Sequence, residues 1–258
     1  MSEILRKDIP HLHDMEKDKF EHFMKELARN HWVFQGYVMS WKLDGFVAQF
    51  GKGVDGKPWF RSARSPLIYK ENSDAFLEFA RKNGRPLARA QAYKILVEDL
   101  LDSGFIRSLP PGSSITAEFF DNNQGIEVGD SFMRFVTIPY RYCVLGSRMT
   151  IFPYVIENAP DVQVVLGFGH QIELDGIQIR SPYLSYDPID LELIRTLDWK
   201  AQLSNIGQQI LSSKRIPELY DLGPVVEGIV IYPFSHLGDD QPYKIISDDF
   251  RQLLKKNK

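Results

Sequence analysis

The sequence of 258 residues predicts a mixed α+β fold. Some segments repeat apolar residues every three or four positions, as amphipathic helices do, and others alternate with a period of two, as strands do. Asp-Gly pairs at residues 55–56 and 175–176 each separate two extended runs and are strong hairpin signals. No run of about 18 apolar residues occurs, so the sequence predicts no membrane-spanning helix.

The helical patterns begin and end at residues that typically bound helices. Asp14 can cap the first helix, and Gly84 follows the second. Pro86 and Gly104 bound the third, as residues of these types often do at helix starts and just past helix ends. The predicted helices cover residues 14–30, 73–83, 86–103, 188–213 and the end of segment 242–258.

The extended runs are rich in β-branched and aromatic residues and are separated by turn residues. The run at residues 33–52 is broken at Asp44-Gly45, and segment 224–233 is a nearly continuous apolar strand containing one carboxylate. No repeat or linker is present, so we expect a helical segment, residues 1–32, before one domain, residues 33–258. The other predicted strands cover residues 58–64, 115–120, 140–146, 149–156, 162–169, 170–184 and the start of segment 242–258.

The composition limits the class of protein. A single cysteine, Cys143, excludes an internal disulfide bond and fits a reducing compartment, so we expect a cytoplasmic protein. The N-terminus lacks the apolar stretch of a secretory signal. The formal net charge of −3 is not that of a general nucleic-acid binder, so a protein that handles polynucleotide would need a local basic patch.

The segment Lys42-Leu43-Asp44-Gly45 places charge at the end of an apolar run. Partial desolvation of a lysine there would favour the neutral amine, which is a nucleophile suited to covalent catalysis. Gly45 would let a phosphate approach the backbone closely. The alternative is an ordinary strand-end lysine before an Asp-Gly turn.

Further charges lie within predicted strands. Arg61 and Arg64 fall on opposite faces of their strand, so one of them could face the same cleft as Lys42. Glu118 and Glu227 lie among apolar residues, where a carboxylate is costly to bury unless it is paired, hydrogen-bonded or bound to a cation. Solvated edge-strand arginines and structural ion pairs are the alternatives.

In their order along the chain, these elements resemble the motifs of the covalent nucleotidyltransferase superfamily, which includes ATP-dependent DNA ligases, RNA ligases and mRNA capping enzymes. KLDG resembles the nucleophile motif, SAR the following Ser-Lys/Arg motif, and TAEFF the glutamate-bearing third motif. VEGIVIYP resembles the fourth motif and PYKIISDDF the fifth, so the resemblance spans Lys42 to Lys244. It implies an antiparallel-sheet adenylation domain with flanking helices, similar to that of phage-type RNA ligases.

The resemblance also implies roles for single residues. Lys42 would take AMP from ATP and pass it to a polynucleotide 5′-phosphate, from which a 3′-hydroxyl displaces it. Asp44 would orient Lys42, and Lys244 would contact the α-phosphate. Glu227 would bind the divalent metal, expected to be Mg²⁺. The implied ribose contacts are Arg64, with Arg61 as the other register, and Glu118, and the implied adenine-stacking residues are Phe152 and Tyr154.

Two features depart from the family pattern. The fifth motif usually carries two lysines one residue apart, and Ile246 stands where the second would be if Lys244 is the first. The sequence ends about 14 residues after Lys244, too few for the OB-fold domain of DNA ligases and capping enzymes, so none is expected. Substrate grip would then come from the N-terminal helix or a partner protein.

We therefore expect an ATP- and Mg²⁺-dependent polynucleotide ligase, with RNA ligase favoured over DNA ligase. One alternative is a ligase-like protein that binds nucleotide or nucleic acid without ligating, which Ile246 motivates. The other is a capping-type guanylyltransferase, which would use GTP in place of ATP.

Overall fold

The chain divides into two compact units in a computed structural model. Unit 1 comprises Met1–Leu43 and Tyr183–Lys258, and unit 2 comprises Asp44–Pro182, so the first division falls inside the KLDG segment. The expected boundary between residues 32 and 33 lies outside the described residues and stays a prediction. The structure describes residues 11–22, 37–42, 45–62, 65–121, 126–128, 131–133, 149–166, 171–181, 198–202, 204–205, 227–233 and 243–256.

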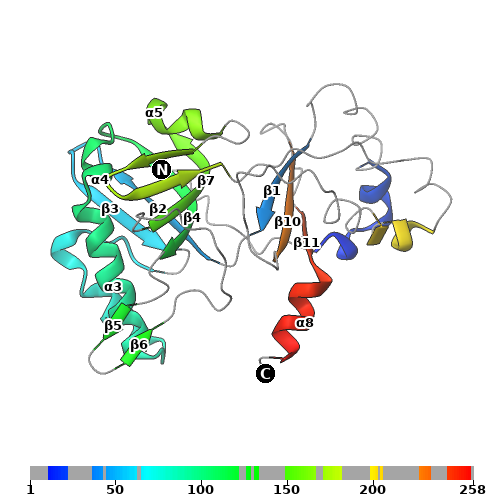
Figure 1. The fold of residues 1–258 in the computed structure, drawn as a ribbon, viewed down its shortest axis with the longest axis horizontal. Coiled ribbons are helices and arrows are strands. Elements are labelled where there is room, and N and C mark those ends of the chain that lie inside the picture. Colours follow the sequence, from blue (N-terminus) through cyan, green and yellow to red (C-terminus); the bar gives the residue numbers. More distant parts are fainter. Residues whose placement is uncertain are drawn as a thin grey trace. The chain divides into compact units, whose positions relative to one another are not determined.

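Helices and strands are mixed, and the sheets are mostly antiparallel, which confirms the α+β prediction. Among the described strands, β7 and β9 form the one parallel pair. Unit 2 is built on a six-stranded sheet with the order β3-β2-β4-β7-β9-β8 (Figure 1). Its strands are β2 (Phe46–Lys52), β3 (Pro58–Ser62), β4 (Ser114–Asp121), β7 (Met149–Glu157), β8 (Gln171–Leu174) and β9 (Ile177–Arg180).

Both predicted Asp-Gly hairpins are confirmed. The β8–β9 turn has positive φ values at Asp175 (53°) and Gly176 (71°), the backbone shape that a two-residue hairpin turn requires. The β2–β3 turn has a φ of 81° at Gly56, and the Gly53 N–H donates to the Lys57 carbonyl at 2.9 Å. A third hairpin, β5 (Ile126–Val128) with β6 (Ser131–Met133), is not predicted by the sequence.

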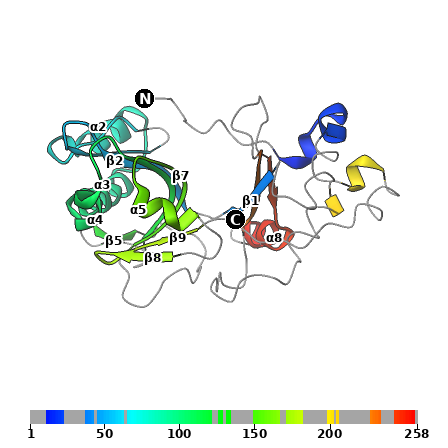
Figure 2. The same cartoon turned by 90° about the horizontal axis from the view of Figure 1, so that it is seen from above.

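Helices pack against one face of the six-stranded sheet and form the core of unit 2. The helices are η2 (Lys70–Asn72), α2 (Ala75–Lys82), α3 (Leu87–Asp102) and α4 (Gly104–Ser108). Figure 2 shows α3 and α4 beside the strands of this unit. Ile115, Ile151 and Ile179 from the sheet and Leu100 and Phe105 from the helices are fully or almost fully buried in one apolar cluster. Successive side chains of a strand point to opposite faces of a sheet, so a different set of side chains lies on the other face.

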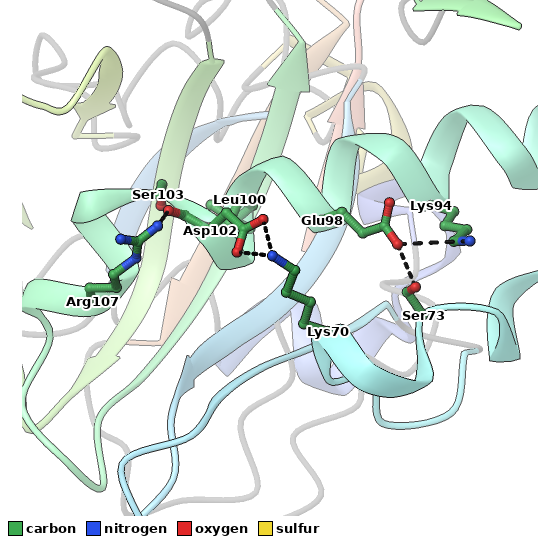
Figure 3. Close-up of polar contacts among 8 residues, drawn as sticks. All are labelled: Lys70, Ser73, Lys94, Glu98, Leu100, Asp102, Ser103 and Arg107. Atoms are coloured by element: carbon green, nitrogen blue, oxygen red, sulfur yellow. Dashed lines mark hydrogen bonds and ion pairs between the residues drawn. The ribbon is translucent and has the colours of Figure 1, made fainter.

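Polar contacts fix the direction of α3 relative to the segment before α2 (Figure 3). Ser73 donates to Glu98 at 2.5 Å, and the same carboxylate lies 3.8 Å from the Lys94 amine one turn earlier. At the end of α3, the Lys70 amine lies 2.6 Å from Asp102. Partly exposed ion pairs contribute only about 0.2–1 kcal/mol each, so the apolar core holds the helix while these contacts orient it.

One local prediction is wrong. The sequence predicts a strand at residues 162–169, whereas α5 (Pro160–Gln163) and η3 (Val164–Leu166) occupy the described part of this segment. Pro160 lies at the first helical position, where a missing N–H costs nothing. The predicted helix end before Gly104 is confirmed, because α3 ends at Asp102 with Ser103 as its C-cap. Gly104 then begins the separate helix α4, which the sequence does not predict and which the Ser103 hydroxyl caps by accepting the Ile106 N–H.

Unit 1 contains a three-stranded antiparallel sheet with the order β1-β10-β11 (Figure 1). Its strands are β1 (Tyr37–Lys42), β10 (Gly228–Pro233) and β11 (Tyr243–Ile246). The helix α8 (Asp248–Lys256) follows β11 at once, and Ser247 caps it by accepting the Phe250 N–H at 3.2 Å. This confirms the strand-to-helix prediction for segment 242–258.

The N-terminal part of unit 1 is helical where it is described. The short helix η1 (Leu12–Asp14) is followed by helical residues 17–22, in agreement with the first half of the predicted helix 14–30. Residues 199–202 are also helical, within the predicted helix 188–213. The predicted strand 140–146 lies outside the described residues. No helix in the described part of the chain is both long and apolar enough to cross a membrane.

Candidate active site

Three of the singled-out residues share one face of the unit 1 sheet. Lys42 lies opposite Gly228, and Gly228 lies opposite Ile246 on the next strand. Lys244 is two residues from Ile246 and therefore lies on the same face. Neighbouring strands are about 4.8 Å apart, so the backbones at Lys42 and Ile246 are about 10 Å apart. The sheet therefore brings together residues from the nucleophile-like and fifth-motif-like segments.

At position 228 of β10, glycine is the residue type that fits without a clash with the neighbouring backbone. A Cβ added there would lie 1.9 Å from the Ile245 carbonyl oxygen and 3.0 Å from the Ile246 Cα. These are backbone atoms, so the neighbour cannot move away as a flexible side chain would. Glycine thus keeps the space between Lys42 and Ile246 free of a side chain and lets β10 and β11 approach each other closely.

Lys42 and Glu227 form an ion pair. The Lys42 amine, at the end of β1, donates to the Oε1 of Glu227, the residue directly before β10, although the two residues are 185 positions apart in the sequence. The lysine side chain is 25% exposed and the glutamate side chain 11% exposed. The Glu227 carbonyl also accepts the Ser247 N–H at 2.8 Å, which ties the backbone at Glu227 to the start of α8. The carboxylate that the sequence placed inside an apolar strand therefore has a cationic partner.

His11 is a site neighbour that sequence reasoning does not find. It forms a parallel β-bridge with Lys244, and its ring stacks on His13 with centroids 4.9 Å apart. Burial lowers the pKa of His11, and the positive charge of Lys244 lowers it further. Among the described residues, the buried His11 Nδ1 has no hydrogen-bond partner. The pairing is tertiary, so no sequence signal links His11 to Lys244.

The metal-binding side chains of unit 1 suit a metal ion that is also coordinated by a bound nucleotide. In the described ranges, no cluster of three or more His, Cys, Asp or Glu side chains could hold a metal ion by itself. Mg²⁺ is usually bound through one or two carboxylates together with phosphate oxygens and water. A single carboxylate such as Glu227 fits that arrangement, in which the nucleotide phosphates supply further ligands.

The second face of the unit 2 sheet carries polar side chains, in contrast to the apolar face that forms the core. Arg61 lies opposite Gln49, which lies opposite Thr116, and in the next row Glu118 lies opposite Phe152. This register puts Arg61 on the same face as Glu118. The side chains on this polar face are Val47, Gln49, Arg61, Thr116, Glu118, Thr150, Phe152, Gln178 and Arg180.

Glu118 is buried on this face and has a defined partner. Glu118 is only 5% exposed, and the Tyr154 hydroxyl donates to its Oε2 at 3.3 Å. Tyr154 lies at a register shift, because Ala117 pairs with Pro153 and Thr116 with Val155. Such a bulge re-aims a side chain, here toward the carboxylate.

Gln178 and Arg180 extend the polar face, and the sequence-based site does not include them. Gln171 accepts from Arg180 Nε at 3.1 Å and lies 3.5 Å from Gln178 Nε2. Two buried atoms on this face, Arg61 Nε and Gln178 Oε1, have no hydrogen-bond partner in the described part of the chain. The available signal was the strict alternation in Ile-Gln-Ile-Arg, which separates a polar from an apolar face.

The remaining predicted site residues are placed less fully. Asp44 and Arg64 lie outside the described residues, and Gly45 is partly exposed before β2. Phe152 is fully buried and Tyr154 is 8% exposed. Their assignment to the adenine ring stays a prediction.

Comparison with known proteins gives little beyond a loose likeness of shape. No family model matches the chain, and no curated protein matches it. Two structures of an RNA ligase from Naegleria gruberi are similar to 97% of this chain at 12% sequence identity. One is an unliganded variant, with 57% of its length covered and a TM-score of 0.40. The other is a variant with ATP and manganese, with 58% covered and a TM-score of 0.32. The chain spans just under three fifths of these proteins, and such scores establish neither a shared family nor a shared activity.

Proposed function

We propose that this protein is an ATP-dependent polynucleotide ligase, with RNA favoured as substrate, that acts through a covalent lysyl-AMP on Lys42. The observation that carries the proposal is the ion pair between Lys42 and Glu227, two residues far apart in the sequence. The motif resemblance assigns these two side chains to one reaction centre, as nucleophile and metal ligand. A chance match of two short motifs gives no reason for the two side chains to bond.

The proposed chemistry begins at the Lys42 amine. The ammonium first gives up a proton, and the neutral amine attacks the α-phosphorus of ATP to form an N–P bond, while the P–O bond to the β-phosphate breaks and pyrophosphate leaves. The nitrogen then loses a second proton to solvent. Lys244, on the same sheet face, stabilises negative charge on the transferring group. AMP then passes from Lys42 to a 5′-phosphate, and attack by a 3′-hydroxyl seals the strand and releases AMP.

Glu227 is the proposed ligand of Mg²⁺, which it would hold together with the nucleotide phosphates. When bound, Mg²⁺ shields the phosphate charge that would otherwise oppose nucleophilic attack. The same carboxylate forms the ion pair with Lys42, which supports placing the nucleophile beside the metal ligand.

Residues of the polar sheet face are proposed to contact the nucleoside. Arg61, Glu118 and Phe152 belong to one polar sheet face, which supports assigning them jointly to ribose and base. Arg64 as the other ribose contact, Asp44 as the group that orients Lys42, and Gly45 at the phosphate remain part of the proposal from the motif resemblance.

The test is covalent labelling with ATP that carries a labelled α-phosphate. We expect the purified protein with Mg²⁺ to become labelled and Lys42→Ala to lose the label completely, because Lys42 is the proposed nucleophile. Lys57→Ala is the matched control, since Lys57 is an exposed lysine of the β2–β3 turn. Label retained by Lys42→Ala would remove Lys42 as the nucleophile. Labelling by GTP in place of ATP would favour a capping-type guanylyltransferase.

A second candidate function is nucleotide or nucleic-acid binding without ligation. Ile246 favours it, because this apolar side chain shares the sheet face of Lys42 and Lys244 where the family pattern has a second lysine. Sealing of 5′-phosphorylated RNA to a 3′-hydroxyl end separates the two functions. Binding of ATP or AMP without a covalent adduct would support the second candidate, and efficient sealing would exclude it.

A further inference from the structure

A pocket of about 630 Å³ lies within unit 2, between the α2–α3 corner and the strands β2 and β3. Its volume is in the range of small-molecule and nucleotide pockets. Lys42, Lys244 and Glu227 are not among its lining residues. Its lining residues are Val47, Ser62, Ser65, Phe76, Phe79, Ala80, Arg85, Pro86, Arg89, Ala90 and Tyr93.

The rim of this pocket is basic, although the whole chain carries a net charge of −3. Residues 79–97 contain five Lys or Arg residues and no Asp or Glu. Arg81, Lys82, Arg85 and Arg89 are exposed, and none of the four has an ion-pair partner among the described residues. This segment therefore supplies the local basic patch that a polynucleotide-binding protein of this net charge needs.

The neighbouring lysines of unit 2 behave differently. Lys57 pairs with Glu71 at 3.5 Å, Lys70 with Asp102 at 2.6 Å, and Lys94 with Asp74 at 2.6 Å. Figure 3 shows Lys70 with Asp102 and Lys94 with its other partner, Glu98. The unpaired charges at the corner thus differ from these three ion-paired lysines.

Both arginines that line the pocket lie over aromatic rings. The Arg85 guanidinium lies 5.3 Å from the Phe79 ring centroid, and that of Arg89 lies 5.8 Å from the Tyr93 ring centroid. A ring fixes the guanidinium plane without neutralising its charge, which leaves its N–H groups available to phosphate. Arginine planes and aromatic rings are also the surfaces on which unpaired bases stack.

The corner that carries these arginines is held by backbone contacts. Gly84 has a φ of 62°, and the Arg85 N–H donates to the Ala80 carbonyl at 2.9 Å, which closes the end of α2. The Asn83 side chain donates to the Phe79 carbonyl at 2.7 Å. Pro86 then starts α3 with a fixed φ. The arginines therefore project from a preorganised turn, which lowers the entropic cost of binding.

From this arrangement we infer that the α2–α3 pocket binds single-stranded polynucleotide, with Arg85 and Arg89 contacting phosphates. The inference takes its ligand class from the proposed ligase function and adds where the strand docks. The volume of the pocket suits one or two nucleotides of a strand. The arginines have no ion-pair partners among the described residues and lie over aromatic rings, which suits contacts with phosphates and bases. The pocket would hold part of the RNA strand.

The test is the binding of a fluorescent single-stranded oligoribonucleotide to the full chain, followed by anisotropy at several salt concentrations. Arg85→Gln with Arg89→Gln should weaken binding on the order of tenfold at low salt. The slope of log K against log salt should become shallower by about 1.4, because single strands contribute about 0.7 per neutralised phosphate. The matched control is Lys57→Gln with Lys70→Gln, which removes the same charge from ion-paired, exposed lysines and should leave the slope unchanged.

Other outcomes would overturn the inference. Equal losses in the two double variants would show a non-specific charge effect. Unchanged oligonucleotide binding with a raised ATP requirement for Lys42 labelling would assign the pocket to the nucleotide. Displacement of the oligonucleotide by an equally charged acidic peptide would assign it to a protein partner. Labelling of Lys42 by ATP without added polynucleotide tests the proposed ligase function alone. Failure of the proposed function can therefore be told from failure of the polynucleotide-binding inference.

Discussion

At the scale of single residues, the proposed chemistry depends on the ion pair between Lys42 and Glu227. Both side chains are sheltered, so solvent screens their interaction less than it would screen a surface pair. When one partner of such a pair is removed, the remaining charge stays partly buried without compensation. The pair is therefore a sensitive point for both stability and activity.

We predict that Glu227→Gln lowers the rate of Lys42 labelling on the order of a hundredfold. The reason is that a charge placed at the reacting phosphate makes a large electrostatic contribution to the stability of the transition state. The amide keeps the shape of the side chain but cannot replace a charged metal ligand, so the Mg²⁺ concentration for half-maximal labelling should also rise. The measurement is the initial labelling rate across an Mg²⁺ titration. Glu157→Gln, which changes an exposed carboxylate of β7, should leave both quantities unchanged.

An unaltered Mg²⁺ response in Glu227→Gln would remove Glu227 from the metal role. Loss of labelling together with a large loss of thermal stability would instead assign the pair a structural role. Circular dichroism melting of the same samples separates these two results.

The residues of the candidate site differ in how far sequence could identify them. Lys42 and Glu227 stand out because a charge in an apolar strand is costly unless it has a partner, and the structure supplies that partner. Gln178 is a neutral polar residue in a short hairpin, where exposure is the ordinary expectation. Its burial depends on which sheet face is covered, which local pattern does not determine.

At the scale of elements, sequence reasoning works where the structure is set by neighbours along the chain. The β8–β9 and β2–β3 hairpins follow from Asp-Gly turns, and α8 follows from its serine cap and amphipathic pattern. It fails for residues 160–166, where an apolar run without strict alternation fits a strand or a helical turn and Pro160 decides for the turn. The β1–β10–β11 order joins distant segments, and no local signal specifies it.

Gly228 is the element-scale position at which this sheet can be tested. We predict that Gly228→Ala destabilises the protein by about 1–3 kcal/mol, because its Cβ would collide with the backbone of β11 and force the strands apart. Labelling of Lys42 should fall as well, since Lys42 lies directly opposite this residue. Thermal unfolding and α-labelled ATP incorporation measure the two effects.

The matched control is Gly84→Asn at the end of α2. Gly84 has a positive φ that asparagine tolerates, and no atom lies within 4 Å of an added Cβ. It should change stability little and labelling not at all. Wild-type stability and labelling in Gly228→Ala would contradict the close approach of β10 and β11.

At the scale of the whole molecule, the chain builds one unit from a continuous segment and the other from both ends. The buried apolar cluster of unit 2 draws all its members from residues 48–179, inside Asp44–Pro182. Unit 1 instead depends on strand pairing between segments near the two ends of the sequence. Composition and local pattern contain no sign of this division, because it arises from long-range pairing.

This arrangement predicts that residues 44–182 fold when they are expressed alone. The fragment retains the six-stranded sheet, its helices and a complete apolar core, which is the requirement for an independent domain. It should unfold in one cooperative thermal transition, and Ile151→Ala should lower the midpoint, because deleting a fully buried side chain costs about 2–5 kcal/mol. The fragment lacks Lys42 and should take no label from ATP, yet it should keep the salt-dependent oligonucleotide binding of the α2–α3 pocket. A fragment without a cooperative transition would show that unit 2 needs unit 1 to fold.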